Sequence, residues 1–278
     1  MAEEQADRSN MAAALSRQAG IDTSVAHPAR VYDYWLGGKD NFAADREAAE
    51  RVLAATPGLR ARVLANRAFL ARAVRYLSAE AGIRQFLDIG TGKPTANNTH
   101  EVAQQVGPDS RIVYVDNDPI VLTHARALLA SGPEGSTQYV DGDIRDSAAI
   151  VEAAASSLDF SQPTALMLLG IMHLVQDSED PYRIVADLMS HLPSGSYLVL
   201  SHPASDFNVT EQAEAQRRYN ERVSTPQTLR TREEVARFFD GLELVPPGLV
   251  YVHTWRPDPG DIVPQDGKSA HGGVGRKS

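Results

Sequence analysis

The sequence predicts an α/β protein with a doubly wound, mostly parallel sheet and a helical cap ahead of it. Three observations predict this class. From residue 85 onward, short apolar segments of strand length alternate with segments of helix length, which is typical of a parallel sheet covered on both faces. A Gly-rich turn follows the first of these segments, and two helical segments at 43–55 and 59–81 come before it.

Length and composition exclude several classes of protein. The 278 residues correspond to one large domain, with or without an attachment, and can bury a core without disulfides or metals. The net formal charge of −9 repels nucleic acid and anionic membrane surfaces, so we expect neither as a partner. The chain has no cysteine, which excludes cysteine-bound zinc and agrees with a cytoplasmic location. Its longest apolar stretch, at 165–172, is too short to span a bilayer.

The first 82 residues form the expected attachment. We expect residues 1–24, rich in Ala, Gln and Ser, to be disordered or a frayed helix, and residues 25–82 to form a helical cap or lid. The helix at 59–81 is closed by Gly82, and Arg67 falls in the middle of its apolar stripe. An Arg on a buried face must find an anion or a set of carbonyl groups.

The sheet is predicted within residues 83–255, and residues 256–278, rich in Gly, Pro and polar side chains, are predicted to be a flexible tail. The candidate strands are 85–89, 111–115, 137–140, 165–169, 197–201, 243–245 and 249–254. The candidate helices between and after them are 95–106, 120–130, 147–156, 181–192 and 231–241.

The Gly-rich turn contains Asp88, Gly90 and Gly92. Such a turn lets a ligand approach the backbone where the next helix presents its N–H groups. Its spacing does not fit a P-loop, and Thr95 stands where the dinucleotide fingerprint has a third small residue. Asp88, just ahead of the glycines, suits a ligand that carries an ammonium group. The competing interpretation is a tight turn without a ligand.

Acidic residues also end the next two predicted strands. Asp116, followed by Asn117, lies where a carboxylate can accept both hydroxyls of a ribose. The alternative is a helix cap, a role that Asp118 fits better. After the third strand, Asp143 can accept from an adenine amino group while Ile144 packs on the ring. By itself, this second acidic run is more often a simple turn.

Together these sites resemble the class I S-adenosylmethionine-dependent methyltransferases over about residues 85–254. The resemblance implies a Rossmann-like sheet of seven strands with S-adenosylmethionine as the cofactor. It assigns the residues at the strand ends to parts of that cofactor: the methionine part to Asp88, Gly90 and Gly92, the ribose to Asp116, and the adenine to Asp143 and Ile144. Asn117 is also expected to bind the cofactor.

A narrower resemblance covers most of the chain. The segments 29–34 (ARVYDY), 37–42 (GGKDNF), 66–70 (NRAFL) and 88–92 (DIGTG) are similar to an actinomycete S-adenosyl methyltransferase family with a domain of formerly unknown function. This family implies the cofactor but not the methyl acceptor.

The resemblance also implies a role for the cap, because class I enzymes often carry an N-terminal helical segment over the cofactor cleft. The rings of Tyr32 and Tyr34 would pack on the sulfonium or the adenine, and Arg67 would bind the methionine carboxylate. The alternative is that the tyrosines pack the helices on the sheet and that Arg67 pairs with Asp33 or Asp40.

Two histidines follow the fourth and fifth predicted strands. His173 and His202 are candidate general bases, since an unperturbed pKa of about 6.5 suits proton transfer. The alternative is that each bonds a nearby loop. Transfer to oxygen or nitrogen can also proceed by alignment alone, because the sulfonium is already activated. The histidine spacing does not fit a metal site, so we expect none.

The sequence therefore predicts methyl transfer from S-adenosylmethionine to a small-molecule acceptor at oxygen or nitrogen. It names neither the acceptor nor the oligomeric state. Two alternatives remain open at this point: a non-catalytic protein that binds S-adenosylmethionine or a nucleoside, and an NAD-dependent oxidoreductase.

Overall fold

The computed structural model describes residues 23–56, 58–92, 97–118, 121, 134–206, 216–217, 220 and 225–278. Most of the start that we expected to be disordered or frayed, at 1–24, lies outside these residues, as does nearly all of the helix expected at 120–130. Thr95, in the Gly-rich turn, also lies outside the described residues.

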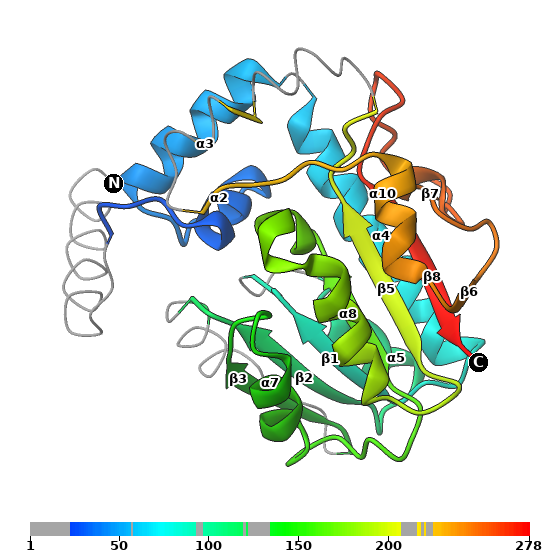
Figure 1. Ribbon diagram of the computed structural model, residues 1–278. Coiled ribbons are helices and arrows are strands. Elements are labelled where there is room, and N and C mark those ends of the chain that lie inside the picture. The colour runs from blue at the N-terminus through cyan, green and yellow to red at the C-terminus, as the bar shows by residue number, and fades with distance from the viewer. Residues whose placement is uncertain are drawn as a thin grey trace.

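The centre of the molecule is an eight-stranded sheet (Figure 1). Seven strands follow the order β3-β2-β1-β4-β5-β8-β6, and β7 pairs with β8 off this path. β1 to β5 pair in parallel, whereas β8 is antiparallel to β5, β6 and β7. The strands are β1 (Gln85–Ile89), β2 (Arg111–Asp116), β3 (Ser136–Asp141), β4 (Ala165–Leu169), β5 (Tyr197–His202), β6 (Leu242–Leu244), β7 (Val250–Tyr251) and β8 (His271–Lys277). The predicted doubly wound, mostly parallel α/β fold is confirmed, but the sheet has eight strands where the resemblance implied seven.

The order of the strands reverses between β1 and β4. The chain runs outward from β1 through β2 to β3, then returns to the other side of β1 as β4 and continues to β5. In open α/β sheets, a ligand binds outside the carboxyl ends of the strands at such a reversal. The topology therefore places the candidate site above the ends of β1, β2 and β4.

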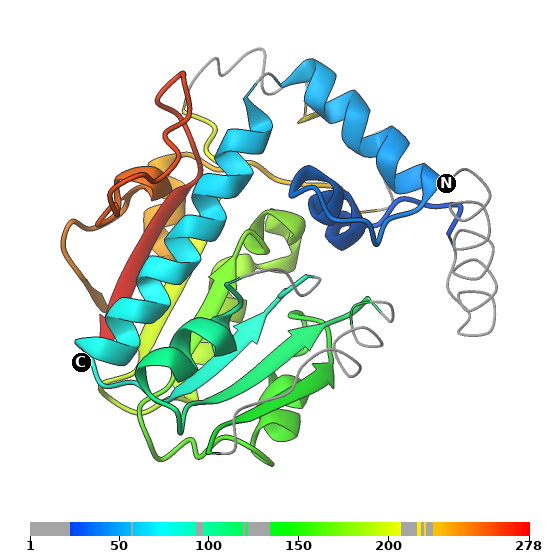
Figure 2. The ribbon, with the colours of Figure 1, turned by 180° about the vertical axis from the view of Figure 1, so that it is seen from behind.

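Helices cover both faces of the sheet. One face carries α4 (Leu59–Ala79) and α5 (Thr99–Val106), which stand in front in Figure 2. The other face carries α7 (Ser147–Ala154), α8 (Pro181–Ser190) and α10 (Arg232–Ala236) (Figure 1). Strands buried on both faces need apolar side chains on both, which explains their continuous apolar sequence.

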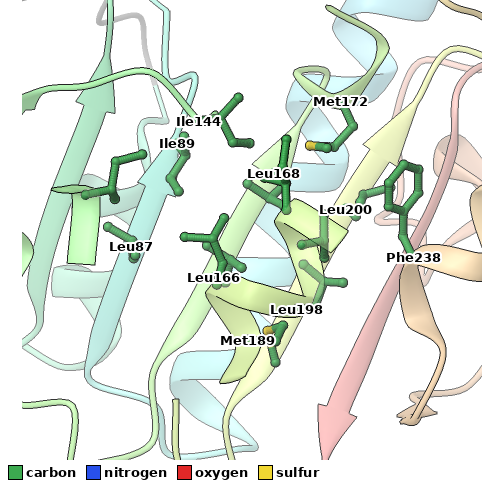
Figure 3. Packing of buried hydrophobic residues seen from close by; sticks show 14 of the residues in the cluster. Leu87, Ile89, Ile144, Leu166, Leu168, Met172, Met189, Leu198, Leu200 and Phe238 are labelled. Atoms are coloured by element: carbon green, nitrogen blue, oxygen red, sulfur yellow. The ribbon is translucent and has the colours of Figure 1, made fainter. Parts of the chain in front are cut away.

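The core consists of two layers, one on each face. On the α8 face, Leu166 and Leu168 of β4 pack in one cluster with Met189 of α8 and Phe238 (Figure 3). On the α4 face, a second cluster surrounds Phe69, which is fully buried.

The cap is smaller than residues 25–82. Of the described helices before β1, only α2 (Pro28–Trp35) and α3 (Ala43–Ala55) lie beyond the carboxyl ends of the strands (Figures 1 and 2). α4 instead packs along the sheet, because its apolar stripe, with Val74 and Leu77 fully buried, belongs to the core. The expected boundary at residue 82 therefore moves to the start of α4.

The expectation of a flexible tail at 256–278 is wrong. β8 lies inside the sheet between β5 and β6. The loop before it is held to α4 by ion pairs of Arg72 with Asp261 and of Arg75 with Asp258. The last predicted strand, at 249–254, is also shorter than expected, since β7 covers only two residues before a 3-10 turn begins.

Candidate active site

The turn after β1 depends on its two glycines. Gly90 has φ of +75°, and a Cβ atom there would lie 2.6 Å from the side chain of Ile171. Gly92 has φ of +63°, a conformation that other residues rarely adopt. The Gly92 N–H donates to Oδ2 of Asp116 at 2.9 Å, so the turn after β1 is fastened to the end of β2.

A pocket lies beside this turn, on the α4 face of the sheet. Its lining residues come from α4, β1, the turn, α5, β2 and β3: Arg67, Leu70, Asp88, Thr91, Gly92, Asn98, Thr99, Tyr114 and Tyr139. One cation and one carboxylate thus line the same small space. Arg67 donates from Nη2 to the Asn97 carbonyl and to Oδ1 of Asn98, both at 3.3 Å.

Asp88 is a buried carboxylate in this pocket. It stands in register with Tyr114 on β2, which in turn stands in register with Tyr139 on β3. Oδ2 of Asp88 accepts the hydroxyl of Thr99 at 2.6 Å. Burial raises the pKa of Asp88 to about 6, although the Thr99 hydrogen bond and the positive charge of Arg67 act to lower it.

Asp116 ends β2 at the same edge. Its two carboxylate oxygens accept the backbone N–H groups of Gly92 and Asp118, each at 2.9 Å. Burial raises the pKa of Asp116, and these two hydrogen bonds act against that shift. The next residue, Asn117, donates its side-chain amide to Asp143 at 3.2 Å and so links the second acidic position to the third.

Asp143 belongs to a polar network outside the pocket. It accepts from the backbone N–H and from Nη1 of Arg145, at 3.0 and 3.1 Å, and Nε of Arg145 also binds Glu179. Partial burial acts to raise the pKa of Asp143, but the bonds from Arg145 and Asn117 outweigh it and lower that pKa. Ile144 is 4% exposed and packs in the core (Figure 3), which leaves little of its surface for an adenine ring.

The cap is held above this edge by contacts of polar and charged side chains. Nδ1 of His27 lies 3.1 Å from Oδ2 of Asp118, and Nε of the buried Arg30 lies 3.8 Å from the same oxygen. Arg30 also pairs with Asp45 of α3 at 3.4 Å. Because the Asp118 backbone N–H holds Asp116, the cap connects directly to the acidic end of β2.

The two cap tyrosines have different surroundings. The hydroxyl of Tyr32 accepts the side-chain amide of Asn66 on α4 at 3.3 Å, so Tyr32 lies beside the helix that carries Arg67. Tyr34 instead bonds Glu50 of α3, and Arg60 lies over its ring at 5.5 Å from the centroid. The structure therefore brings Tyr32 to the candidate site, whereas Tyr34 joins the cap helices to the start of α4.

His202 at the end of β5 is fully buried, and both of its ring nitrogens are bonded. Nη1 of Arg230 lies 3.0 Å from its Nε2, and the Pro203 carbonyl lies 2.9 Å from its Nδ1. Because Arg can only donate, Nε2 must accept and Nδ1 must carry the proton. Burial lowers the pKa of His202 well below its usual range. No lone pair remains for a general base, and we do not carry this prediction forward.

His173 has a different environment after β4. Its Nδ1 is shielded from solvent and has no hydrogen-bond partner among the described residues. Burial, with the charge of Arg230, lowers the pKa of His173 to about 4, so the ring is neutral at pH 7. Of the two predicted histidines, only His173 keeps an available nitrogen at this end of the sheet.

Sequence reasoning missed three residues that organise the site. Arg230 donates to the carbonyls of Met172 and Val175 and fixes the loop after β4. Arg30 and Asn66 join the cap to the site. The one sequence signal for Arg30 and Asn66 is their position inside the segments that carry the family resemblance.

No helix in the described part of the chain is long and apolar enough to cross a membrane. The same residues contain no group of three or more His, Asp or Glu side chains that is arranged to hold a metal ion.

A Rossmann-like sheet with a Gly-rich turn, two acidic strand ends and a helical cap fits the class I S-adenosylmethionine-dependent methyltransferases. The chain belongs to the S-adenosyl methyltransferase family, whose model matches residues 14–278. The protein is thus a methyltransferase that uses S-adenosylmethionine, and family membership decides against the NAD-dependent oxidoreductase and the non-catalytic binding protein.

Solved structures agree with this assignment. A DUF574 family protein from Streptomyces avermitilis is 49% identical with a TM-score of 0.88, over 92% of this chain and 99% of that chain. A candidate methyltransferase from Thermobifida fusca is 44% identical with a TM-score of 0.83, and the match covers 93% of this chain and 97% of that chain. Both organisms are actinomycetes, as the resemblance implied. A search of curated proteins finds no match.

An O-methyltransferase family protein from Burkholderia thailandensis is more distant. It is 14% identical with a TM-score of 0.50, over 79% of this chain and 60% of that chain. Likeness at this level supports the fold alone.

Proposed function

We propose that this methyltransferase acts on a small molecule, at a hydroxyl oxygen or an amine nitrogen. The observation that carries the proposal is the pocket in which Arg67 and Asp88 face the turn at Gly92. The methionine part of the cofactor ends in a carboxylate and an ammonium group, so it needs one cation and one anion close together.

The residues at this edge fit the rest of the cofactor as well. Arg67 can exchange its long hydrogen bonds to Asn97 and Asn98 for a bidentate bond to the carboxylate. Asp88 suits the ammonium, because a nearby cation stabilises the ionised form of a buried carboxyl group. Asp116 accepts two backbone N–H groups, and a carboxylate has about four acceptor positions, which leaves two for the ribose hydroxyls.

When bound, the cofactor supplies a methyl group already activated on a sulfonium, so the protein's part is to align the acceptor. His173 lies at the end of β4, next to the turn of β1 in the sheet order. Because the His173 ring is neutral, its Nδ1 can accept a hydrogen bond from the molecule that receives the methyl group. The cap over the strand ends and the net charge of −9 favour a small molecule over a nucleic acid.

Calorimetry with S-adenosylmethionine tests the cofactor site. We expect Asp116→Ala to weaken binding at least about tenfold, since it removes the hydrogen bonds to two hydroxyls. Asp141→Ala is the matched control, because Asp141 stands in register with Asp116 on β3 but is exposed. A wild-type protein that does not bind millimolar cofactor contradicts the proposal.

A further inference from the structure

Asn66 and Tyr32 form a polar pair that the proposed cofactor site does not use. Asn66 lies on α4, one residue before Arg67, and its Nδ2 donates to the Tyr32 hydroxyl at 3.3 Å. Its Oδ1 is shielded from solvent and has no hydrogen-bond partner among the described residues. Buried polar atoms nearly always have a partner, so an unsatisfied amide oxygen calls for an explanation.

The pair offers one hydrogen-bond acceptor and one donor. Oδ1 of Asn66 is the acceptor. The Tyr32 hydroxyl uses a lone pair for Asn66, and burial raises its pKa, so it keeps a proton that it can donate. Turning the Asn66 amide by 180° would exchange the two roles but would still leave one donor and one acceptor.

The pair lies beside the end of β4. A Cβ atom on Gly170, the residue after β4, would lie 3.7 Å from Nδ2 of Asn66. The next residue, Ile171, packs against Gly90 of the β1 turn. His173, two residues further on, contributes a buried nitrogen, Nδ1, that has no hydrogen-bond partner among the described residues. Asn66 thus stands between the Arg67 pocket and the loop after β4.

We propose that Asn66 and Tyr32 bind the reacting group of the methyl acceptor, which enters as a neutral hydroxyl or amine. This inference rests on the proposed function. A neutral hydroxyl or amine can donate to Asn66 and accept from Tyr32 at the same time. A carboxylate cannot donate, and an ammonium group has no lone pair with which to accept. Because α2 carries Tyr32 and covers Asn66, the acceptor reaches them when α2 moves.

The test uses the ¹⁵N-labelled full chain saturated with S-adenosylhomocysteine. The probes are phenol, aniline and benzyl alcohol, their methylated partners anisole, N,N-dimethylaniline and benzyl methyl ether, and benzoate. We expect at least one hydroxyl or amine probe to shift the Asn66 side-chain amide resonance. The same probe should bind at least about five times more tightly than its methylated partner. Benzoate should leave this resonance unchanged.

Variants separate binding from support of the fold. Asn66→Leu and Tyr32→Phe, which keeps the ring of Tyr32, should each remove the preference for the hydroxyl or amine over its methylated partner. For Asn66→Leu, S-adenosylhomocysteine affinity should stay within about twofold. Arg75→Gln, an exposed change on the same helix, is the control and should retain the preference. A purely structural Asn66 would lower the melting temperature on substitution without changing the preference.

The two proposals fail in different ways. This inference alone is overturned if the wild type binds S-adenosylhomocysteine but no probe shifts the Asn66 amide resonance. The same holds if each hydroxyl or amine and its methylated partner shift that resonance equally. A wild-type protein that binds neither S-adenosylmethionine nor S-adenosylhomocysteine overturns the proposed function and this inference with it.

Discussion

At the scale of single residues, burial of the Asp88 carboxyl group makes its ionised form unfavourable for stability. Its pKa rises from 3.8 to about 6 because the carboxyl group is buried beside the tyrosines of β2 and β3. The folded state therefore binds a proton more tightly than the unfolded state does. The contribution of Asp88 to stability is complete below about pH 4 and is lost as the pH rises through 6. At neutral pH the protein thus holds an ionised carboxylate for which the fold gives little compensation.

The proposed ammonium partner predicts a pH-dependent affinity. A bound cation favours the ionised form of Asp88, so S-adenosylmethionine should bind about tenfold more weakly at pH 5 than at pH 7. Asp88→Asn should weaken binding at pH 7 and flatten this dependence. Calorimetry between pH 5 and pH 8 measures both effects. Equal affinity of the wild type at pH 5 and pH 7 would argue against the Asp88 contact.

The same variant should be more stable than the wild type at pH 8. Removing a carboxylate whose pKa is raised by about two units should increase the free energy of unfolding by up to about 3 kcal/mol, and the gain should vanish near pH 4. Denaturant unfolding at the two pH values checks this. Asp109→Asn is the control, since that exposed carboxylate pairs with Arg84 at the surface.

The sequence could predict the acids of this site but not all of its partners. Asp88 and Asp116 follow buried strands, and parallel strands bring their carboxyl ends to one edge. The roles of Arg230 and His202 come from contacts with each other and with the loop after β4, which lie far apart along the chain. No spacing in the sequence encodes those contacts.

At the scale of elements, the strands divide by how much their own sequence specifies them. β1 and β4 begin and end where the apolar pattern predicts. β8 (HGGVGRK) has one branched apolar residue and three glycines, a pattern typical of a loop. It becomes a strand because neighbours approach its backbone closely. A Cβ atom on Gly272 would lie 2.6 Å from the Val252 side chain, and one on Gly275 would lie 2.8 Å from the Phe239 side chain.

Neighbouring glycines of β8 should respond differently to alanine. Gly272→Ala should destabilise the protein by about 1–3 kcal/mol, because its methyl group would overlap both Val252 and Phe69. Gly273→Ala should be neutral or stabilise by less than about 1 kcal/mol, since its nearest neighbour would be 3.4 Å away. Chemical denaturation measures both. Similar losses for the two variants would refute close packing as the reason for glycine at 272.

At the scale of the whole molecule, the cap and the sheet are connected through one buried set of charges. Arg30 lies between Asp45 of the cap and Asp118 of the sheet, and all three side chains are buried. Asp118 in turn holds Asp116 through its backbone N–H. We infer that the position of the cap and the geometry of the proposed ribose site depend on each other.

Replacing Arg30 tests that dependence. Arg30→Met keeps the apolar length of the side chain but removes the buried positive charge beside Asp45 and Asp118. Removing one partner of a buried ion pair typically costs about 3–5 kcal/mol. The cap has fewer core contacts than the sheet, so we expect it to open locally while the sheet remains folded. Protease cleavage within residues 23–56, mapped by mass spectrometry, should become faster, and S-adenosylmethionine affinity should fall.

Arg51→Met is the matched control, because Arg51 pairs with Glu47 at the exposed surface of α3 and its loss should cost less than about 1 kcal/mol. In the wild type, saturating S-adenosylmethionine should slow cleavage of the cap, since a ligand that binds the closed form lowers the population of the open form. If Arg30→Met opens the cap but leaves the affinity unchanged, the cap and the cofactor site act independently. Reduced affinity together with faster cleavage is the result that the connection through Asp118 requires.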